Sequence, residues 1–230
     1  MYKYEMHLHT NVCSACGISS GEEMVKVAKE KGYTGIVITN HFYHGNTAIS
    51  RRTPWREFVK AYKEDYLDAK KAGEKYGIEV LFGIEEGYGK GKETLIYGIS
   101  PELLMDTPDF SHMTIVEMSK FVRANNGFIV AAHPFRVRDY IAEPRKAPDT
   151  TLFDALETYN HINSFEDNDL AEQLCKKSGL LRTSGGDVHS IHGIGNAGLA
   201  FYERITNNEQ LVTALKAGNY KLIISGEIEE

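Results

Sequence analysis

The 230-residue sequence lacks the features of an exported, membrane-spanning or disulfide-rich protein. It has only three cysteines, and its first residues, Met1 to His7, do not resemble a secretory leader, so we expect a cytoplasmic protein with reduced thiols. No apolar run approaches the roughly 18 residues that a membrane span needs. The formal net charge of −6 argues against a broad contact surface for duplex nucleic acid. The sequence therefore predicts a soluble globular protein with neither a membrane nor a stable nucleic-acid partner.

Linkers, low-complexity segments and repeats of fixed period are also missing. The glycines between Gly83 and Gly91 do not form the Gly-x-Gly-x-x-Gly turn that opens a helix in dinucleotide-binding domains. A chain of this length without an internal boundary fits one α/β domain, residues 1–230, of the size of a barrel.

Strand-like and helical segments alternate along the chain. Ser20 is positioned to cap one helix, and Thr53-Pro54 is positioned to open a longer one that ends near Tyr76. Because strands and helices alternate, we expect parallel strands joined by right-handed crossovers. The strand-like runs are Lys3–Leu8, Gly35–Thr39, Glu79–Ile84, Thr94–Ile99, Phe128–Ala132, Ala155–Tyr159, Leu180–Ser184 and Leu222–Ser225, and the other helical segments are Ile115–Ala124, Asp167–Lys177 and Glu209–Ala217.

Histidines and carboxylates follow several of these runs. Side chains alternate across a strand, so His7 and His9 point to one face, and Asp187 and His189 have the same spacing. A strand that only needed a buried face would use aliphatic residues there. The set therefore predicts a centre for metal ions that bind imidazole and carboxylate, with the ligands His7, His9, His41, Glu85, His133, Asp187 and His189.

The order of these motifs resembles the PHP (polymerase and histidinol phosphatase) family of metal-dependent phosphoesterases, over nearly the whole chain. The matching motifs are His7-x-His9, Thr39-Asn40-His41, Gly83-Ile84-Glu85, His133-Pro134 and Gly186-Asp187-Val188-His189. The resemblance implies a distorted (β/α)7 TIM-like barrel with two or three divalent transition-metal ions, Zn, Mn or Fe, at the carboxyl ends of the strands.

The resemblance also implies how the ligands divide among the ions. His7, His9, Glu85 and Asp187 would hold the first ion, Glu85 and His133 the second, and His41 and His189 the third. Glu85 and Asp187 are accordingly interpreted as catalytic, with Glu85 bridging two ions.

The chain departs from the family pattern at three places. Asn40 replaces an aspartate and brings no charge, and the loop after His9 offers Cys16 as the replacement for a further ligand. A histidine often found near the end of the fourth strand is missing, because the chain reads Tyr97-Gly98-Ile99-Ser100 there.

Two residues are candidates for substrate binding. Arg136 follows His133 by three residues, and a guanidinium at the barrel mouth can hold a phosphate through two parallel hydrogen bonds, although a surface salt bridge is an equal alternative. His161, at the end of a strand, can contact substrate or act as an acid, or be a solvated loop residue.

The motifs together predict metal-dependent hydrolysis of a phosphorylated small molecule or of a nucleotide or oligonucleotide phosphodiester. An amidohydrolase acting on a C–N bond and a non-catalytic metal-stabilised module remain as alternatives. The bridging Glu85 and the terminal Asp187-x-His189 pair favour the phosphoesterase. The sequence determines neither the substrate nor the metal, because specificity depends on loop shape and on metal availability.

Overall fold

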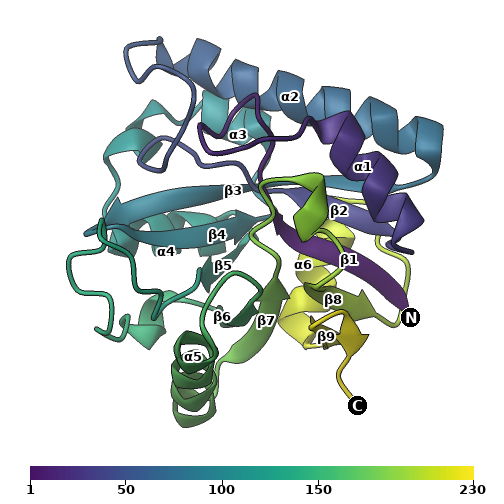
Figure 1. Cartoon of the computed structure of the whole chain (residues 1–230). Helices are drawn as coiled ribbons and strands as arrows, with labels where there is room; N and C mark the ends of the chain where they lie inside the picture. Colours follow the sequence, from purple (N-terminus) through teal and green to yellow (C-terminus); the bar gives the residue numbers. More distant parts are fainter.

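Ten strands form one continuous curled sheet in the computed structural model, which describes residues 1–230 (Figure 1). Their order across the sheet is β10-β9-β8-β1-β2-β3-β4-β5-β6-β7. The strands are β1 (Tyr2–Leu8), β2 (Gly35–Ile38), β3 (Glu79–Gly89), β4 (Lys92–Tyr97), β5 (Phe128–Ala131), β6 (Ala155–Asn160), β7 (Leu181–Gly185), β8 (Ala197–Phe201), β9 (Tyr220–Ile224) and β10 (Glu227–Ile228).

The sheet curls until its seventh strand meets its first. Val188, just after β7, forms a parallel bridge with Leu8 of β1, through hydrogen bonds from His9 N to Val188 O (2.8 Å) and from Val188 N to His7 O (3.0 Å). The expected distorted (β/α)7 TIM-like barrel is therefore confirmed. Its helices lie on the outside of the curled sheet (Figure 1).

The expectation of parallel strands is wrong for β9, which pairs antiparallel with β8 and β10, and for β4. This strand runs antiparallel to both β3 and β5, because β3 turns directly into it through Lys90 and Gly91, both with positive φ. The segment from Gly87 to Lys92 is thus the tip of a hairpin. The consequence is that the first residues of β4, and not its last, lie at the edge where β3 and β5 end.

The helices begin and end close to their predicted limits. Ser20 caps α1 (Gly21–Glu30) in a capping box with Glu23, and Pro54 precedes α2 (Trp55–Tyr76), which ends at Gly77 in the left-handed conformation. The remaining helices are α3 (Pro101–Met105), α4 (Ile115–Ala124), α5 (Phe165–Ser178) and α6 (Asn208–Ala217), with short 3-10 turns η1 (Pro108–His112), η2 (Thr150–Leu152) and η3 (Ile191–Gly193).

Strand β8 was not anticipated. Its sequence, Ala-Gly-Leu-Ala-Phe, has no β-branched residue, and Gly198 has a φ of 127°. A Cβ atom at this glycine would lie 2.1 Å from Tyr4 O, so only glycine allows β8 to pair this closely with β1. Through this pairing the last part of the chain is joined to the first strand of the barrel.

Buried apolar side chains fill the space between the sheet and its helices. Phe58 and Tyr62 of α2 pack with Phe82 and Ile84 of β3, and Met24 of α1 belongs to a second cluster. The helical spacing of aromatic residues in α2 therefore reflects the core. None of the helices is both long and apolar enough to span a membrane.

Candidate metal centre

The predicted metal ligands gather at one end of the barrel. His7 is the penultimate residue of strand β1, and His9 lies just after that strand. His41 follows β2, and Glu85 lies within β3. His133 follows β5, and Asp187 and His189 follow β7. Apart from His189, which is partly exposed, these side chains are buried. The structure thus brings together residues that lie up to 182 positions apart in the chain, counted from His7 to His189.

Glu85 lies at the middle of the group. Its Oε1 is 2.9 Å from Nε2 of His133 and 3.2 Å from Nε2 of His7, and its Oε2 is 2.8 Å from Nδ1 of His41. On the other side, Asp187 Oδ1 is 3.2 Å from Nε2 of His9. Glu85 therefore has imidazoles close to both of its oxygens, as a bridging position requires.

Backbone conformation helps to aim two of these side chains. His133 and Asp187 have φ values of 29° and 50°, a region that residues other than glycine seldom adopt. Gly185 lies next to this turn, and a Cβ atom there would be 2.4 Å from Glu157 Oε1 and 2.6 Å from the Cβ of His7. The glycine therefore allows β7 to approach His7 closely. The positive φ values of His133 and Asp187 are strained backbone conformations, which are typical of functional sites.

The buried carboxylates make the group attract positive charge. Burial lowers the pKa of His7, but Asp187 and Glu85 outweigh it and hold this pKa well above its usual range. Burial raises the pKa of Glu85, yet His7 and His41 hold it well below its usual range. Burial and the neighbouring His41 lower the pKa of His9 to about 3. Glu85 is thus an anion, and His9 is a neutral imidazole with a free lone pair.

Several buried atoms at the centre make no hydrogen bond. They are Nε2 of His7 and His9, Nδ1 of His41 and Oε2 of Glu85. Buried polar atoms without partners are rare in proteins and call for an explanation such as an ion. These atoms belong to imidazole and carboxylate groups that lie within 4.8 Å of one another in overlapping triplets. The side chains therefore fit divalent metal ions.

Glu157, which sequence reasoning missed, orients two of the ligands. Its Oε1 is 2.9 Å from Nδ1 of His7, and its Oε2 accepts the backbone N–H of His133 (2.9 Å) and an N–H of Asn160 (3.0 Å). Since a carboxylate can only accept, the proton of His7 lies on Nδ1, which leaves Nε2 as a ligand atom. A charged residue at the middle of an otherwise apolar strand was the feature that could have identified it.

Another set of hydrogen bonds orients His9 from helix α2. Asp65 Oδ2 accepts from Asn40 Nδ2 (2.7 Å), and Asn40 Oδ1 accepts from the Ser14 hydroxyl (2.9 Å). The Ser14 oxygen also accepts the backbone N–H of His41 and lies 3.1 Å from Nδ1 of His9. Because the hydroxyl has only one proton, His9 must donate from Nδ1, which leaves its Nε2 as the ligand atom. Asn40 brings no charge, but its hydrogen-bond partner Asp65 places a carboxylate one contact further from His9.

Glu93 is a second carboxylate that the sequence did not single out. It lies near the start of β4, almost completely buried, with Oε1 3.2 Å from Nδ1 of His41 and Oε2 3.6 Å from Nε2 of His133. Its place at the centre depends on the antiparallel direction of β4, which brings Glu93 opposite Gly87.

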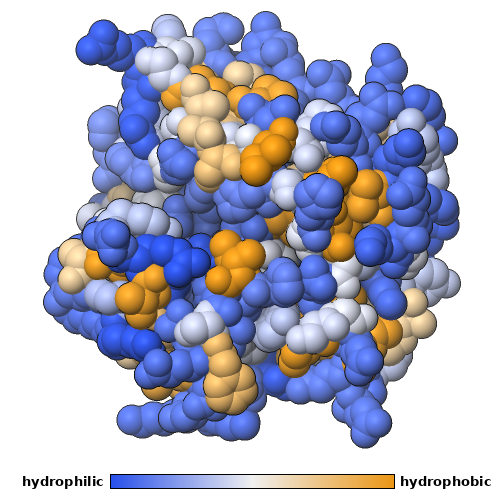
Figure 2. Space-filling view, viewed as in Figure 1, coloured by the Kyte–Doolittle hydropathy of each residue, from blue (hydrophilic) through white to orange (hydrophobic).

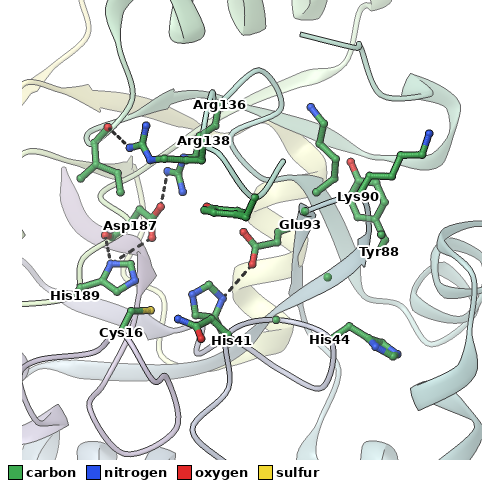
Figure 3. A pocket seen from close by; sticks show the side chains of 18 of the residues that line it. Cys16, His41, His44, Tyr88, Lys90, Glu93, Arg136, Arg138, Asp187 and His189 are labelled. Atoms are coloured by element: carbon green, nitrogen blue, oxygen red, sulfur yellow. Dashed lines mark hydrogen bonds and ion pairs between the residues drawn. The ribbon is translucent and has the colours of Figure 1, made fainter. Parts of the chain in front are cut away.

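Cys16 lies between His41 and His189 in the half-buried loop after β1 (Figure 3). Burial raises the pKa of its thiol, but hydrogen bonds with His189 and His41 outweigh this and lower it to about 6. Its sulfur is therefore largely a thiolate at neutral pH, the form that binds metals.

The two candidate substrate-binding residues lie in different surroundings. Arg136 is buried rather than on the rim: its guanidinium donates to Asp187 Oδ2, to Asn160 Oδ1 (2.9 Å) and to Asn163 Oδ1 (2.9 Å). It still borders the cavity above the centre. His161 lies in the turn after β6 and does not border this cavity.

A cavity of about 950 Å³ opens above the ligands. Its wall includes four cationic side chains, of which Lys90 pairs with Glu143, Lys92 binds backbone carbonyls and Arg136 binds Asp187. Arg138 also points toward this space (Figure 3), and it donates only to the carbonyls of Val137 and Ile162. The surrounding surface is mainly hydrophilic, with separate apolar patches (Figure 2). The cavity thus has room for more than a phosphate group, and one of its cations has no carboxylate partner.

Comparisons with known proteins agree with this geometry. The model of the PHP domain family matches residues 5–163, and that of a PHP-associated family matches residues 165–220. The PolC-type DNA polymerase III of Streptococcus mutans is 28% identical over 131 residues, which are 56% of this chain and 7% of the polymerase. The chain therefore spans less than a tenth of the curated relatives it matches.

Solved structures share the fold. A two-domain protein from Bacteroides vulgatus, described as containing a predicted PHP-like metal-dependent phosphoesterase, superimposes with a TM-score of 0.71 at 15% identity, over 99% of this chain and 66% of that one. Endonuclease Q bound to a duplex with an abasic lesion superimposes with a TM-score of 0.59 at 14% identity, over 94% of this chain and 56% of that one.

Proposed function

We propose that this chain, which belongs to the PHP family, hydrolyses a phosphate ester with water activated by bound divalent metal ions. The observation that carries the proposal is the set of buried imidazole and carboxylate atoms without hydrogen-bond partners, in a cluster that reaches the wall of a cavity through His41, Asp187 and His189. A purely structural ion site would be closed, whereas a catalytic one keeps access to substrate. We further propose that residues 1–230 act as one unit, since β8 pairs with β1.

We propose that the ligands divide as the resemblance implied, with Cys16 added to the third group. His7, His9, Glu85 and Asp187 would hold one ion, Glu85 and His133 a second, and His41, His189 and Cys16 a third. Metal ions bound there would supply Lewis acidity and a hydroxide at neutral pH. Glu85 has imidazoles on both oxygens and is suited to bridge, while Arg136 holds Asp187 in position and neutralises part of its charge.

The cavity sets limits on the substrate. Its volume of about 950 Å³ is at the upper end of small-molecule sites and suits a nucleotide or the end of an oligonucleotide as well as a small phosphomonoester. The similarity to a DNA polymerase and to endonuclease Q supports a nucleotide-like substrate. Arg138 is suited to hold a phosphate oxygen because no carboxylate neutralises it, and a substrate contact of Arg136 or His161 stays a prediction.

A substrate screen with metal analysis tests the proposal. Metal-loaded protein should hydrolyse at least one member of a panel of phosphomonoesters and phosphodiesters, and Glu85→Gln should abolish this turnover and lower the metal content. Glu143→Gln, which changes an exposed carboxylate near the cavity, should retain both. Turnover of amides alone would identify an amidohydrolase instead. Full metal loading without any turnover would identify a binding module.

A further inference from the structure

The candidate ligands on the two sides of the proposed metal centre differ chemically. On one side, two carboxylates, Glu85 and Glu93, face the imidazole of His133. On the other, the thiol of Cys16 lies with the imidazoles of His41 and His189. We refer to these as the carboxylate side and the thiolate side.

Glu93 has no partner other than the metal centre. No lysine or arginine lies within ion-pair distance of its carboxylate, and the basic groups within that distance are the imidazoles of His41 and His133. The adjacent Lys92 points away and binds the carbonyls of Pro134 and Pro144. A carboxylate this deeply buried normally pairs with a cation.

The position of Glu93 is determined by the hairpin. The register pairs Glu93 with Gly87, two residues beyond Glu85, and Glu93 O accepts the N–H of Ala132 just before His133. Glu93 is thereby fixed against the two strands that supply Glu85 and His133. Beside it, Glu85 Oε2 is buried without a hydrogen-bond partner, which indicates a position for a cation next to the two carboxylates.

We propose that the centre is heterometallic: Glu93 completes a site with Glu85 and His133 for an oxygen-preferring ion such as Mn²⁺ or Fe²⁺, whereas Cys16, His41 and His189 bind Zn²⁺. Carboxylate oxygens favour Mn²⁺ and Fe²⁺ relative to a thiolate site, and the combination of thiolate and imidazole is typical of Zn²⁺. The inference rests on the proposed metal binding but not on turnover. It assigns different metals to the two sides where the family resemblance left the metal open.

Competitive loading tests this assignment. Zn²⁺ binds a given set of ligands more tightly than Mn²⁺. Protein stripped with a chelator is therefore dialysed anaerobically against Mn²⁺ in large excess over Zn²⁺, and both metals are counted by mass spectrometry. Wild type should retain both. Glu93→Gln should lose about one Mn²⁺ per chain and keep its Zn²⁺, and Glu93→His should keep the total while replacing Mn²⁺ by Zn²⁺. Cys16→Ser should lose Zn²⁺ and keep Mn²⁺.

Cobalt provides a second readout. Co²⁺ bound by a thiolate has a charge-transfer band in the near ultraviolet, which wild type and Glu93→Gln should show and Cys16→Ser should lack. Glu143→Gln is the matched control and should behave as wild type. Unchanged Mn²⁺ in Glu93→Gln, or loss of the same metal from both site variants, would overturn the inference. These results are independent of the substrate screen, so failure of the proposed activity is distinguishable from failure of the metal assignment.

Discussion

Replacing Glu157 by glutamine should weaken metal binding although Glu157 itself faces away from the ions. Its two oxygens together accept three hydrogen bonds, from His7 Nδ1, the His133 N–H and Asn160. A glutamine has only one oxygen, so its NH₂ group must face either His7 or the other two donors. If it faces His7, the imidazole proton must move to Nε2, the atom that lies 3.2 Å from Glu85.

The expected loss follows from the orienting role of Glu157. Replacing a residue that orients a metal ligand lowers affinity by about 10-fold to 100-fold, which corresponds to about 1.4 to 2.7 kcal/mol. At saturating metal, the stabilisation of the loaded over the stripped protein should decrease by the same amount, because bound ligand stabilises in proportion to the logarithm of its affinity. Competition with a chromophoric chelator measures the affinity, and thermal unfolding measures the stabilisation.

Glu5 provides a matched control within the same barrel. Burial raises the pKa of Glu5 to about 8, so at pH 7 its carboxyl group is mainly neutral. Its Oε1 accepts the N–H groups of His7 and Gly186, while its Oε2 has no partner, so an amide can replace it without opposing donors. Glu5→Gln should therefore bind metal like the wild type. Equal affinities of Glu157→Gln and wild type would refute the orienting role of Glu157.

Three further outcomes follow from the contacts of the centre. Asp65→Asn should lower metal affinity by about 10-fold, because the group that accepts the hydrogen bond of Asn40 loses its negative charge. The same change at the exposed Asp68 should not lower the affinity, and competition with a chelator measures both variants. In chelator-treated protein, the rate of alkylation of Cys16 should rise with pH through a midpoint near 6, because its pKa is lowered from 9 to about 6 and the reactive thiolate predominates above the pKa. A midpoint near pH 9 would contradict this. Arg138→Ala should raise KM for a phosphorylated substrate about 10-fold or more, as expected for a charge-assisted hydrogen bond, and kinetics equal to those of Arg123→Ala, remote from the cavity, would exclude a substrate contact.

The ligand positions were predictable because they depend on local order in the sequence. His7 and His9 flank the end of an apolar strand, and strand ends of a parallel barrel meet at one edge, so the pattern implies proximity without any knowledge of loops. Helix limits were likewise encoded locally, by Ser20 at the start of α1 and Gly77 after α2. These features need only neighbouring residues to be interpreted.

Residues that depend on strand direction or on distant packing were not predictable in the same way. Glu93 reaches the centre only because β4 is antiparallel, whereas the alternation of strands and helices had indicated a parallel strand. Glu157 contacts His7 across 150 positions, and Asp65 contacts Thr10 across 55. Arg136 was expected at the rim. It is buried because its guanidinium donates to Asn160 and Asp187, two residues that are distant from it in the sequence.

The exchange of aspartate for Asn40 shows how such a distant contact can preserve the chemistry of the centre. An amide alone gives His9 no negative charge to polarise its Nδ1 proton, but Asn40 donates to Asp65 and accepts from Ser14, so its dipole connects the carboxylate to the imidazole. Hydrogen bonds in such a chain polarise one another when they are buried. Asp65 is itself almost fully buried on a face of α2 otherwise occupied by Phe58, Tyr62 and Ala69, where a carboxylate is unfavourable unless it is bonded. Asn40 in the motif and the buried Asp65 on the helix therefore account for each other, and the exchange at position 40 does not indicate a loss of metal binding.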